Sequence, residues 1–186
     1  MNEAVEELAE VLNVPITHGV RSIPWGRSSS DVGVSFPVDY RNFIDIFGSG
    51  MLGGELRVHS PLMRGESMWT EGGFSRIIGR TTMEVGPAFR EMREDFPDRF
   101  PYAIFPEPGG LLEWGGNLNG DRCFWLTEDP DPDRWPVVVW FRGEVASRSW
   151  RREEGGMAAF LLRVVRDPKS ALLASSDERL TWIFGG

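Results

Sequence analysis

The chain has 186 residues, of which 28 are acidic and 20 are basic, and its formal net charge is −8. This length predicts one globular domain, and a hydrophobic content of 41% is enough to form its core. An acidic chain without a dense basic run is not expected to bind nucleic acid or an anionic membrane, because both attract clustered cations. Its single cysteine, Cys123, excludes an internal disulfide bond.

The N-terminal sequence lacks the positively charged start and apolar run of a secretory signal peptide. No apolar stretch of the sequence approaches the roughly 18 residues that a membrane-spanning helix needs. We therefore expect a cytoplasmic protein.

Four segments repeat apolar residues at helical spacing and are expected to form amphipathic helices. They cover residues 5–12, 37–47, 86–96 and 157–165. The first helix has an acidic outer face that includes Glu6 and Glu10. The second begins at Pro37 and stops at Gly48, and the third directs Phe96 toward the core. Residues 23–33 mix turn formers without a period and predict a loop.

Short apolar and aromatic runs, separated by Pro, Gly, Asn and Asp, predict antiparallel strands. They cover residues 56–58, 102–105, 111–114, 123–126, 137–141 and 145–150. Asn119-Gly120 favours a type I′ hairpin that pairs Trp114 with Phe124 or Trp125. Since no strand-helix-strand unit repeats, this order predicts an α+β fold. Four residues of the tail are expected to join the core: Leu172, Leu173, Trp182 and Phe184.

Two letter patterns do not hold up as ligand sites. Residues 48–53 match G-x-G-x-x-G, but they follow a helix and lead to a strand, whereas a dinucleotide fingerprint requires the reverse order. We expect a helix C-cap and a tight turn there. Residues 129–133 read D-x-D-x-D, yet Arg134 and Trp140 stand where a calcium loop needs Gly and Glu.

Catalytic or metal-binding patterns are equally scarce in the sequence. Cys123 lies in a hydrophobic strand, His18 and His59 stand alone, and no elbow serine or zinc-ligand spacing occurs, so we expect no cofactor and no metal. Paired carboxylates are an open alternative, since Glu107, Glu113 and Asp121 lie near the ends of predicted strands. A small hydrolase that uses Glu113 and Asp121 would require both to face one cleft.

The aromatic residues of the predicted strands suggest either a core or a ligand platform. Large rings that alternate along strands are more often buried, so the core is favoured. The residues concerned are Trp114, Phe124, Trp125, Trp135 and Trp140.

Three segments together resemble the SUKH superfamily, the Smi/Knr-type domain. Residues 36–50 are similar to its proline-led helix and Gly-Ser-Gly turn. Residues 111–125 resemble its strand, Asn-Gly-Asp turn and aromatic strand, and residues 135–161 its Trp-led strand and closing Phe-Leu helix. The similarity runs from about Phe36 to Val165, within a single domain of residues 1–186. The recurrent residues are explained as fold determinants: Gly48, Gly50, Asn119, Gly120, Asp121, Trp125 and Trp135.

The resemblance implies an antiparallel sheet flanked by helices and no catalytic apparatus. It also implies one of two roles. Bacterial members act as immunity proteins that neutralise a cognate toxin of a polymorphic toxin system, often a nuclease or deaminase, and fungal members act as scaffolds in cell-wall and stress regulation. We therefore expect a non-enzymatic, monomeric protein that binds a basic toxin domain, with a regulatory adaptor as the alternative.

The contact surface of such an immunity protein is expected to be acidic, because charge complementarity speeds association and rejects wrong partners. The first candidate is the loop that carries Glu128, Asp129, Asp131 and Asp133, which is otherwise a solvated turn. The second candidate is the helix face with Glu6 and Glu10. Charge reversal at the three aspartates is expected to slow association and leave folding intact.

Overall fold

In the computed structural model, which describes residues 2–16, 23–62, 69–145, 148–167, 169–173 and 180–184, the strands form one seven-stranded sheet. Its order is β6-β5-β4-β3-β2-β1-β7, and every neighbouring pair is antiparallel. The strands are β1 (Gly50–Leu52), β2 (Leu56–Val58), β3 (Leu111–Gly116), β4 (Arg122–Leu126), β5 (Val137–Trp140), β6 (Trp150–Glu153) and β7 (Trp182–Phe184). The predicted α+β fold with an antiparallel sheet is confirmed.

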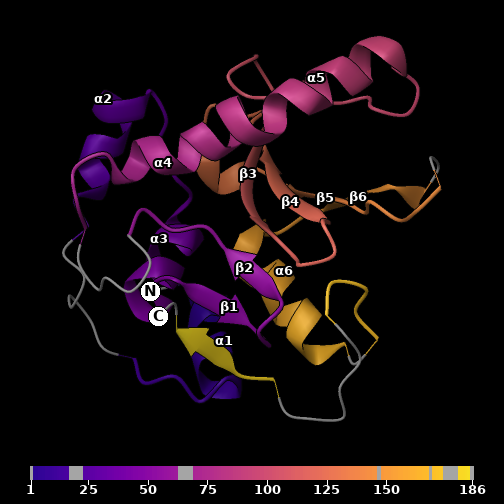
Figure 1. The fold of residues 1–186 in the computed structure, drawn as a ribbon. Helices are drawn as coiled ribbons and strands as arrows, with labels where there is room; N and C mark the ends of the chain where they lie inside the picture. The colour runs from indigo at the N-terminus through magenta and orange to yellow at the C-terminus, as the bar shows by residue number, and fades with distance from the viewer. Residues whose placement is uncertain are drawn as a thin grey trace.

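Helices cover both faces of this sheet, with α1, α3 and α6 packed together on one side and α5 crossing the other (Figure 1). The helices are α1 (Glu3–Val11), η1 (Trp25–Arg27), α2 (Ser28–Val32), α3 (Val38–Phe47), α4 (Gly73–Gly79), η2 (Arg80–Val85), α5 (Gly86–Asp95), η3 (Pro132–Arg134) and α6 (Gly156–Arg166). Among these, η1 and η3 are 3-10 helices and η2 is a π-helix. No helix of the described ranges is long and apolar enough to cross a membrane.

The four predicted amphipathic helices are confirmed as α1, α3, α5 and α6. Asn2 caps α1 by accepting a hydrogen bond from the Val5 amide at 3.3 Å, which satisfies one of the unpaired N–H groups of the first turn. Gly48 ends α3 with a φ of 67°, a left-handed conformation that a residue with a Cβ rarely adopts. The chain then enters β1, so the predicted C-cap and turn are confirmed.

Side chains alternate between two cores along the central strands. On β4, Cys123 and Trp125 join the larger core beneath α1, α3 and α6, whereas Phe124 and Leu126 face Phe89 of α5. This period-2 pattern follows from the pleat, which points successive side chains to opposite faces. The predicted aromatic core is confirmed, since the five rings are buried or half-buried.

The β3–β4 hairpin differs in detail from the prediction. Of the two turn residues only Gly120 has a positive φ, of 92°, and the Gly120 amide bonds the Asn117 carbonyl at 3.2 Å. A type I′ turn needs two positive φ angles, so this longer turn followed by a left-handed glycine replaces it. The register shifts between Glu113 and Gly115, which leaves Trp114 without the direct partner that was predicted.

Other segments also depart from the sequence prediction. The predicted loop 23–33 contains η1 and α2, and 102–105 forms only an isolated bridge at Ile104 instead of a strand. The strand placed at 145–150 begins at Trp150, and Phe96 follows α5 with 51% of its surface exposed. Amphipathic periodicity does not show where a helix ends, and Phe96 falls just beyond the last turn.

The tail supplies the edge strand β7, which pairs with β1. Trp182 is buried and packs edge-on against Phe43 and Phe47 of α3, and Leu172 is also buried. Phe184 is 53% exposed, so its predicted place in the core is wrong. Gly50 lies so close to the Trp182 ring that an added Cβ would come within 2.6 Å of it. Glycine is therefore needed there for the close approach of β1 and β7.

Candidate functional site

The loop that was the first candidate contact surface is bonded to its own chain. Glu128 and Arg152 of β6 form a bidentate ion pair, with its shorter contact at 2.6 Å. Glu128 and Glu154 both raise the pKa of Arg152 well above its ordinary value. A cationic partner would have to compete with Arg152 for the Glu128 carboxylate.

The three aspartates of the loop accept hydrogen bonds from backbone N–H groups. Asp129 accepts from the Asp131 amide at 2.8 Å and Asp131 from the Asp133 amide at 3.1 Å. Asp133 accepts from the amide of Val38, the first residue of α3. Since these carboxylates hold the loop together and fasten it to α3, we expect their reversal to destabilise the fold, in place of the neutral effect expected from the sequence.

The second candidate surface, on α1, has carboxylates without such bonds. Glu3, Glu6 and Glu10 are exposed, and within the described residues their side chains form no hydrogen bond or ion pair. Glu7, between them, is paired with Arg166 of α6. Val5 and Leu8 are fully buried on the opposite side of the helix, so the three free carboxylates stand on a firmly packed element.

The carboxylates proposed for a hydrolase are used separately. Asp121 accepts hydrogen bonds from the Arg142 amide at 2.9 Å and from the Asn117 side chain at 2.8 Å, so it caps the hairpin. Glu113 lies in the interior of the sheet, and its Oε1 is 2.9 Å from an Arg122 guanidinium nitrogen. The paired-carboxylate hypothesis is therefore wrong for Glu113 and Asp121. Glu107 is half-buried and paired with Arg90 and Arg93.

A buried charge network forms around Glu113 instead. The imidazole Nε2 of His59 lies 3.5 Å from Glu113 Oε1 and 3.0 Å from Arg80 Nε, at the start of η2. An arginine N–H needs a lone pair on Nε2, so the shorter contact favours a neutral ring with its proton on Nδ1. The Thr81 hydroxyl also accepts a hydrogen bond of 2.9 Å from the backbone amide of Glu113, and this bond joins η2 to β3.

The pKa values of this network follow from burial and from the two guanidinium groups. Burial lowers the pKa of His59, and the charges of Arg80 and Arg122 lower it further. The Glu113 carboxylate acts in the opposite direction but does not outweigh them. Burial alone would raise the pKa of Glu113, but His59, Arg122 and Arg80 together hold this pKa below its ordinary value. Both directions favour a neutral imidazole beside an ionised carboxylate.

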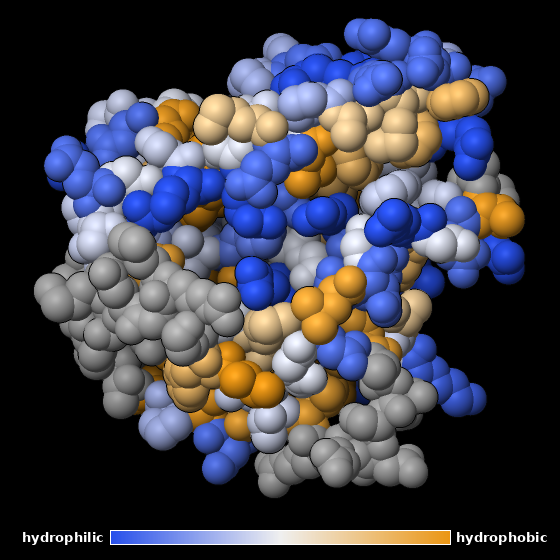
Figure 2. All heavy atoms as spheres, in the orientation of Figure 1, coloured by the Kyte–Doolittle hydropathy of each residue, from blue (hydrophilic) through white to orange (hydrophobic). Residues whose placement is uncertain are grey.

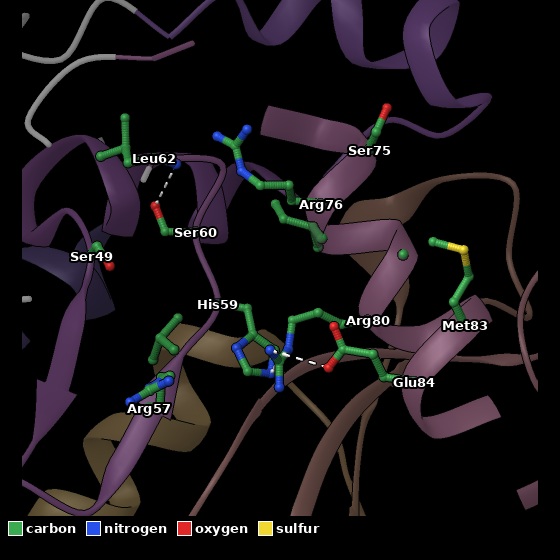
Figure 3. Close-up of a pocket in the computed structure, with 13 residues that line it drawn as sticks. Ser49, Arg57, His59, Ser60, Leu62, Ser75, Arg76, Arg80, Met83 and Glu84 are labelled. Atoms are coloured by element: carbon green, nitrogen blue, oxygen red, sulfur yellow. Dashed lines mark hydrogen bonds and ion pairs between the residues drawn. The ribbon is translucent and has the colours of Figure 1, made fainter. Parts of the chain in front are cut away.

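His59 and Arg80 also line a cavity of about 540 Å³ between β2, the segment 59–62, α4 and η2. Figure 3 shows His59 and Arg80 beside each other, with Arg57 toward β2 and Glu84 on the far side of Arg80. The sequence analysis missed this site because His59 has no partner at a recognisable catalytic or metal-ligand spacing in the sequence. Only the pairing of β2 with β3 brings Glu113 to it, and only η2 brings Arg80.

Nothing in this cavity forms a nucleophile–base pair. In the part of the chain that the structure describes, no hydrogen bond joins a serine hydroxyl to His59. Ser60 Oγ instead accepts a hydrogen bond of 3.1 Å from the Leu62 amide. Cys123 is buried in the core, where burial raises the pKa of its thiol well above the usual range. Described His, Cys, Asp and Glu residues form no cluster of three that could hold a metal ion, and His18 lies outside the described residues. The arrangement is suited to binding an anion.

Comparisons with models of known protein families, with curated proteins and with solved structures gave no match to this chain.

Proposed function

We propose that this chain is a non-enzymatic immunity-type protein that binds and neutralises a basic toxin domain of the nuclease or deaminase class, in the cytoplasm. The observation that carries the proposal is the row of exposed carboxylates at Glu3, Glu6 and Glu10, which have no internal partner in the described chain. The similarity of residues 36–165 to SUKH domains supports the same role. We place the α1 face ahead of the loop 128–133, whose carboxylates are already bonded.

Charge complementarity explains how such a face would act. Unpaired carboxylates on one side of a packed helix produce a negative potential that attracts a cationic domain and speeds its association. An ion pair with the toxin would not first require an internal pair to break, as it would at Glu128. The helix backbone that carries the face is already ordered, so the conformational entropy lost when the partner docks comes mainly from the side chains.

The test is co-purification of the tagged protein from cells that express polymorphic toxins, at low and at high salt, with mass spectrometry of the bound protein. The variant Glu3→Lys/Glu6→Lys/Glu10→Lys reverses the α1 face. The matched control is Glu91→Lys/Glu94→Lys/Asp95→Lys on α5, which makes the same change in net charge at exposed positions on the opposite side of the sheet.

We expect one basic toxin domain to be recovered at low salt and lost as the salt rises. The α1 variant should lower the association rate by about tenfold or more, and the α5 control much less. An equal effect of both variants would show that only net charge matters. Recovery of an endogenous regulator in place of a toxin would overturn the immunity proposal and favour an adaptor.

A further inference from the structure

The cavity beside His59 has a charge opposite to that of the protein. The chain has a net charge of −8, yet among the described residues that line the cavity three are arginines and one, Glu84, is acidic. The arginines are Arg57 on β2, Arg76 on α4 and Arg80 on η2. Figure 2 shows hydrophilic residues gathered on this face between α4 and strands β1 and β2.

Two of these arginines have no carboxylate partner among the residues that the structure describes. Across the described ranges, neither Arg57 nor Arg76 has an acidic oxygen within 4.0 Å. Arg76 is fixed by the Pro61 carbonyl at 2.9 Å and the Thr70 hydroxyl at 3.1 Å. The contact of Arg57 is with Met51 sulfur at 3.9 Å, which is a weak interaction for a guanidinium. An anion in the cavity would supply the partner that both side chains lack.

Arg80 is held at the rim by two contacts. Its Nε donates to His59, which sits against the buried Glu113, and its Nη1 lies 3.5 Å from the Glu84 carboxylate. The Glu84 side chain is 61% exposed, so this pair is weak and easily exchanged for another anion. The π-helix η2, an arrangement frequent at functional sites, places Arg80, Met83 and Glu84 along the same rim.

The rest of the lining defines the body of the ligand. Val58, Leu62, Ile77 and Met83 give the cavity apolar walls, and Ser49 and Ser75 add hydroxyl groups beside the cations. A volume of about 540 Å³ is in the range of sites for small organic molecules. Guanidinium forks combined with hydroxyl donors suit the oxygen atoms of a phosphate group.

We propose that this cavity binds a small organic phosphate, with the phosphate between Arg57 and Arg80 and an aromatic or apolar body against Val58, Ile77 and Met83. The site does not depend on the toxin contact at α1. The bound phosphate replaces Glu84 as the partner of Arg80, so Glu84 acts as an internal competitor.

The test is isothermal titration calorimetry of the full chain with phenyl phosphate and adenosine monophosphate as probes, and with phenol and inorganic phosphate as the two separate halves of the ligand. We expect saturable binding of at least one organic phosphate at millimolar concentration or below, and clearly weaker binding of each half. Equal affinity for inorganic phosphate would overturn the role of the apolar walls. Failure of both organic phosphates to bind would overturn the proposal.

Four variants, one of them a control, separate the site from a merely structural effect. Arg57→Gln and Arg80→Gln should each weaken binding by about tenfold or more, because each removes a charge-assisted hydrogen bond. Arg151→Gln, at an exposed arginine of β6, is the matched control and should leave the affinity unchanged. Glu84→Gln should strengthen binding by a few-fold, since it removes the competitor. Loss of affinity in Glu84→Gln, or an equal loss in all arginine variants, would contradict the assignment.

Discussion

The carboxylate of Asp39, in the first turn of α3, accepts a hydrogen bond of 2.9 Å from the amide of Ala158, in the first turn of α6. One helix thus caps the N-terminus of another that lies far along the chain. Gly155, the N-cap residue of α6, and Gly156, its first residue, offer no side chain that could cap that turn. The link fixes the two helices against each other on one face of the sheet.

Asp39→Ala should lower the free energy of unfolding by about 1–2 kcal/mol, the usual cost of a lost N-cap. Asp39→Asn keeps one of the two oxygens that accept amide N–H groups, from Ala158 and from Tyr40, and should lose less than Asp39→Ala, because burial raises the pKa of Asp39, so the negative charge itself is not favoured there. Urea unfolding of the three proteins measures both values. If Asp39→Asn lowered the free energy of unfolding as much as Asp39→Ala does, the charge of the carboxylate, and not the accepting atom, would be what stabilises α6.

Gly156→Ala should destabilise the protein more than Gly155→Ala. Both glycines have a positive φ, of 80° at Gly156 and 95° at Gly155, so both substitutions strain the backbone by roughly 1 kcal/mol. An added Cβ at Gly156 would also come within 2.7 Å of the Asp39 carboxylate, whereas at Gly155 it would meet only Ala159 at 3.8 Å. Thermal unfolding of the two variants gives the comparison, and equal melting temperatures would contradict this close approach.

Stability should fall as the pH is lowered through the range just below 6.5. Burial lowers the pKa of His59 from its ordinary value of 6.5, so the unfolded chain takes up a proton at a pH where the folded chain does not. The neutral imidazole therefore makes its full contribution to the free energy of unfolding above pH 6.5, and this contribution is lost as the pH falls toward the lowered pKa of the folded protein. The lowered pKa of Glu113 acts in the same direction below 4.5.

Urea unfolding at about pH 7.5 and about pH 5.5 measures this dependence. His59→Gln is the control, because an amide oxygen can still accept the Arg80 N–H and does not titrate. His18 is present in both proteins, so its contribution cancels in the difference. An identical loss of stability in the wild type and the variant would show that His59 is not the group responsible.

Asp133→Ala should cost about 1 kcal/mol, since it removes the acceptor for the Val38 amide at the start of α3. Glu6→Ala removes an exposed carboxylate without a partner in the described residues and should change stability by less than about 0.5 kcal/mol. Chemical denaturation of both variants distinguishes the carboxylates that build the fold from those available to a partner. The reverse order would assign the free acidic surface to the loop.

Local pattern was sufficient for the four longest helices, α1, α3, α5 and α6, and for most central strands. The apolar residues that recur at helical spacing up to Leu12 and up to Phe47 each specify one buried helix face. They therefore predict a helix without knowledge of the element against which it packs. The bulge at Trp114 and the π-helix after Gly79 could not be read in this way, because packing between distant elements decides them. The Nε2 of His59 meets Glu113 only through the register of the sheet, which no local spacing contains.

The acidic loop shows the limit of reading function from composition. A run with four carboxylates predicted a contact surface, but the same side chains accept backbone N–H groups and pair with Arg152. Asp is common in turns for this reason, so its clustering in a loop says as much about chain geometry as about partners. Glu3, Glu6 and Glu10 of α1 form no such bonds within the described residues, so the clustering of carboxylates alone does not show which of them are free.

The pairing of β1 with β7 joins two parts of the sequence that lie far apart. The neighbours β1–β2, β3–β4, β4–β5 and β5–β6 each join consecutive strands, whereas the Trp182 indole bonds the Phe47 carbonyl across 135 residues. Closing so long a loop has a larger entropic cost than closing a hairpin and slows the step that depends on it. By pairing with β1, β7 covers an edge that the sheet would otherwise present to other chains.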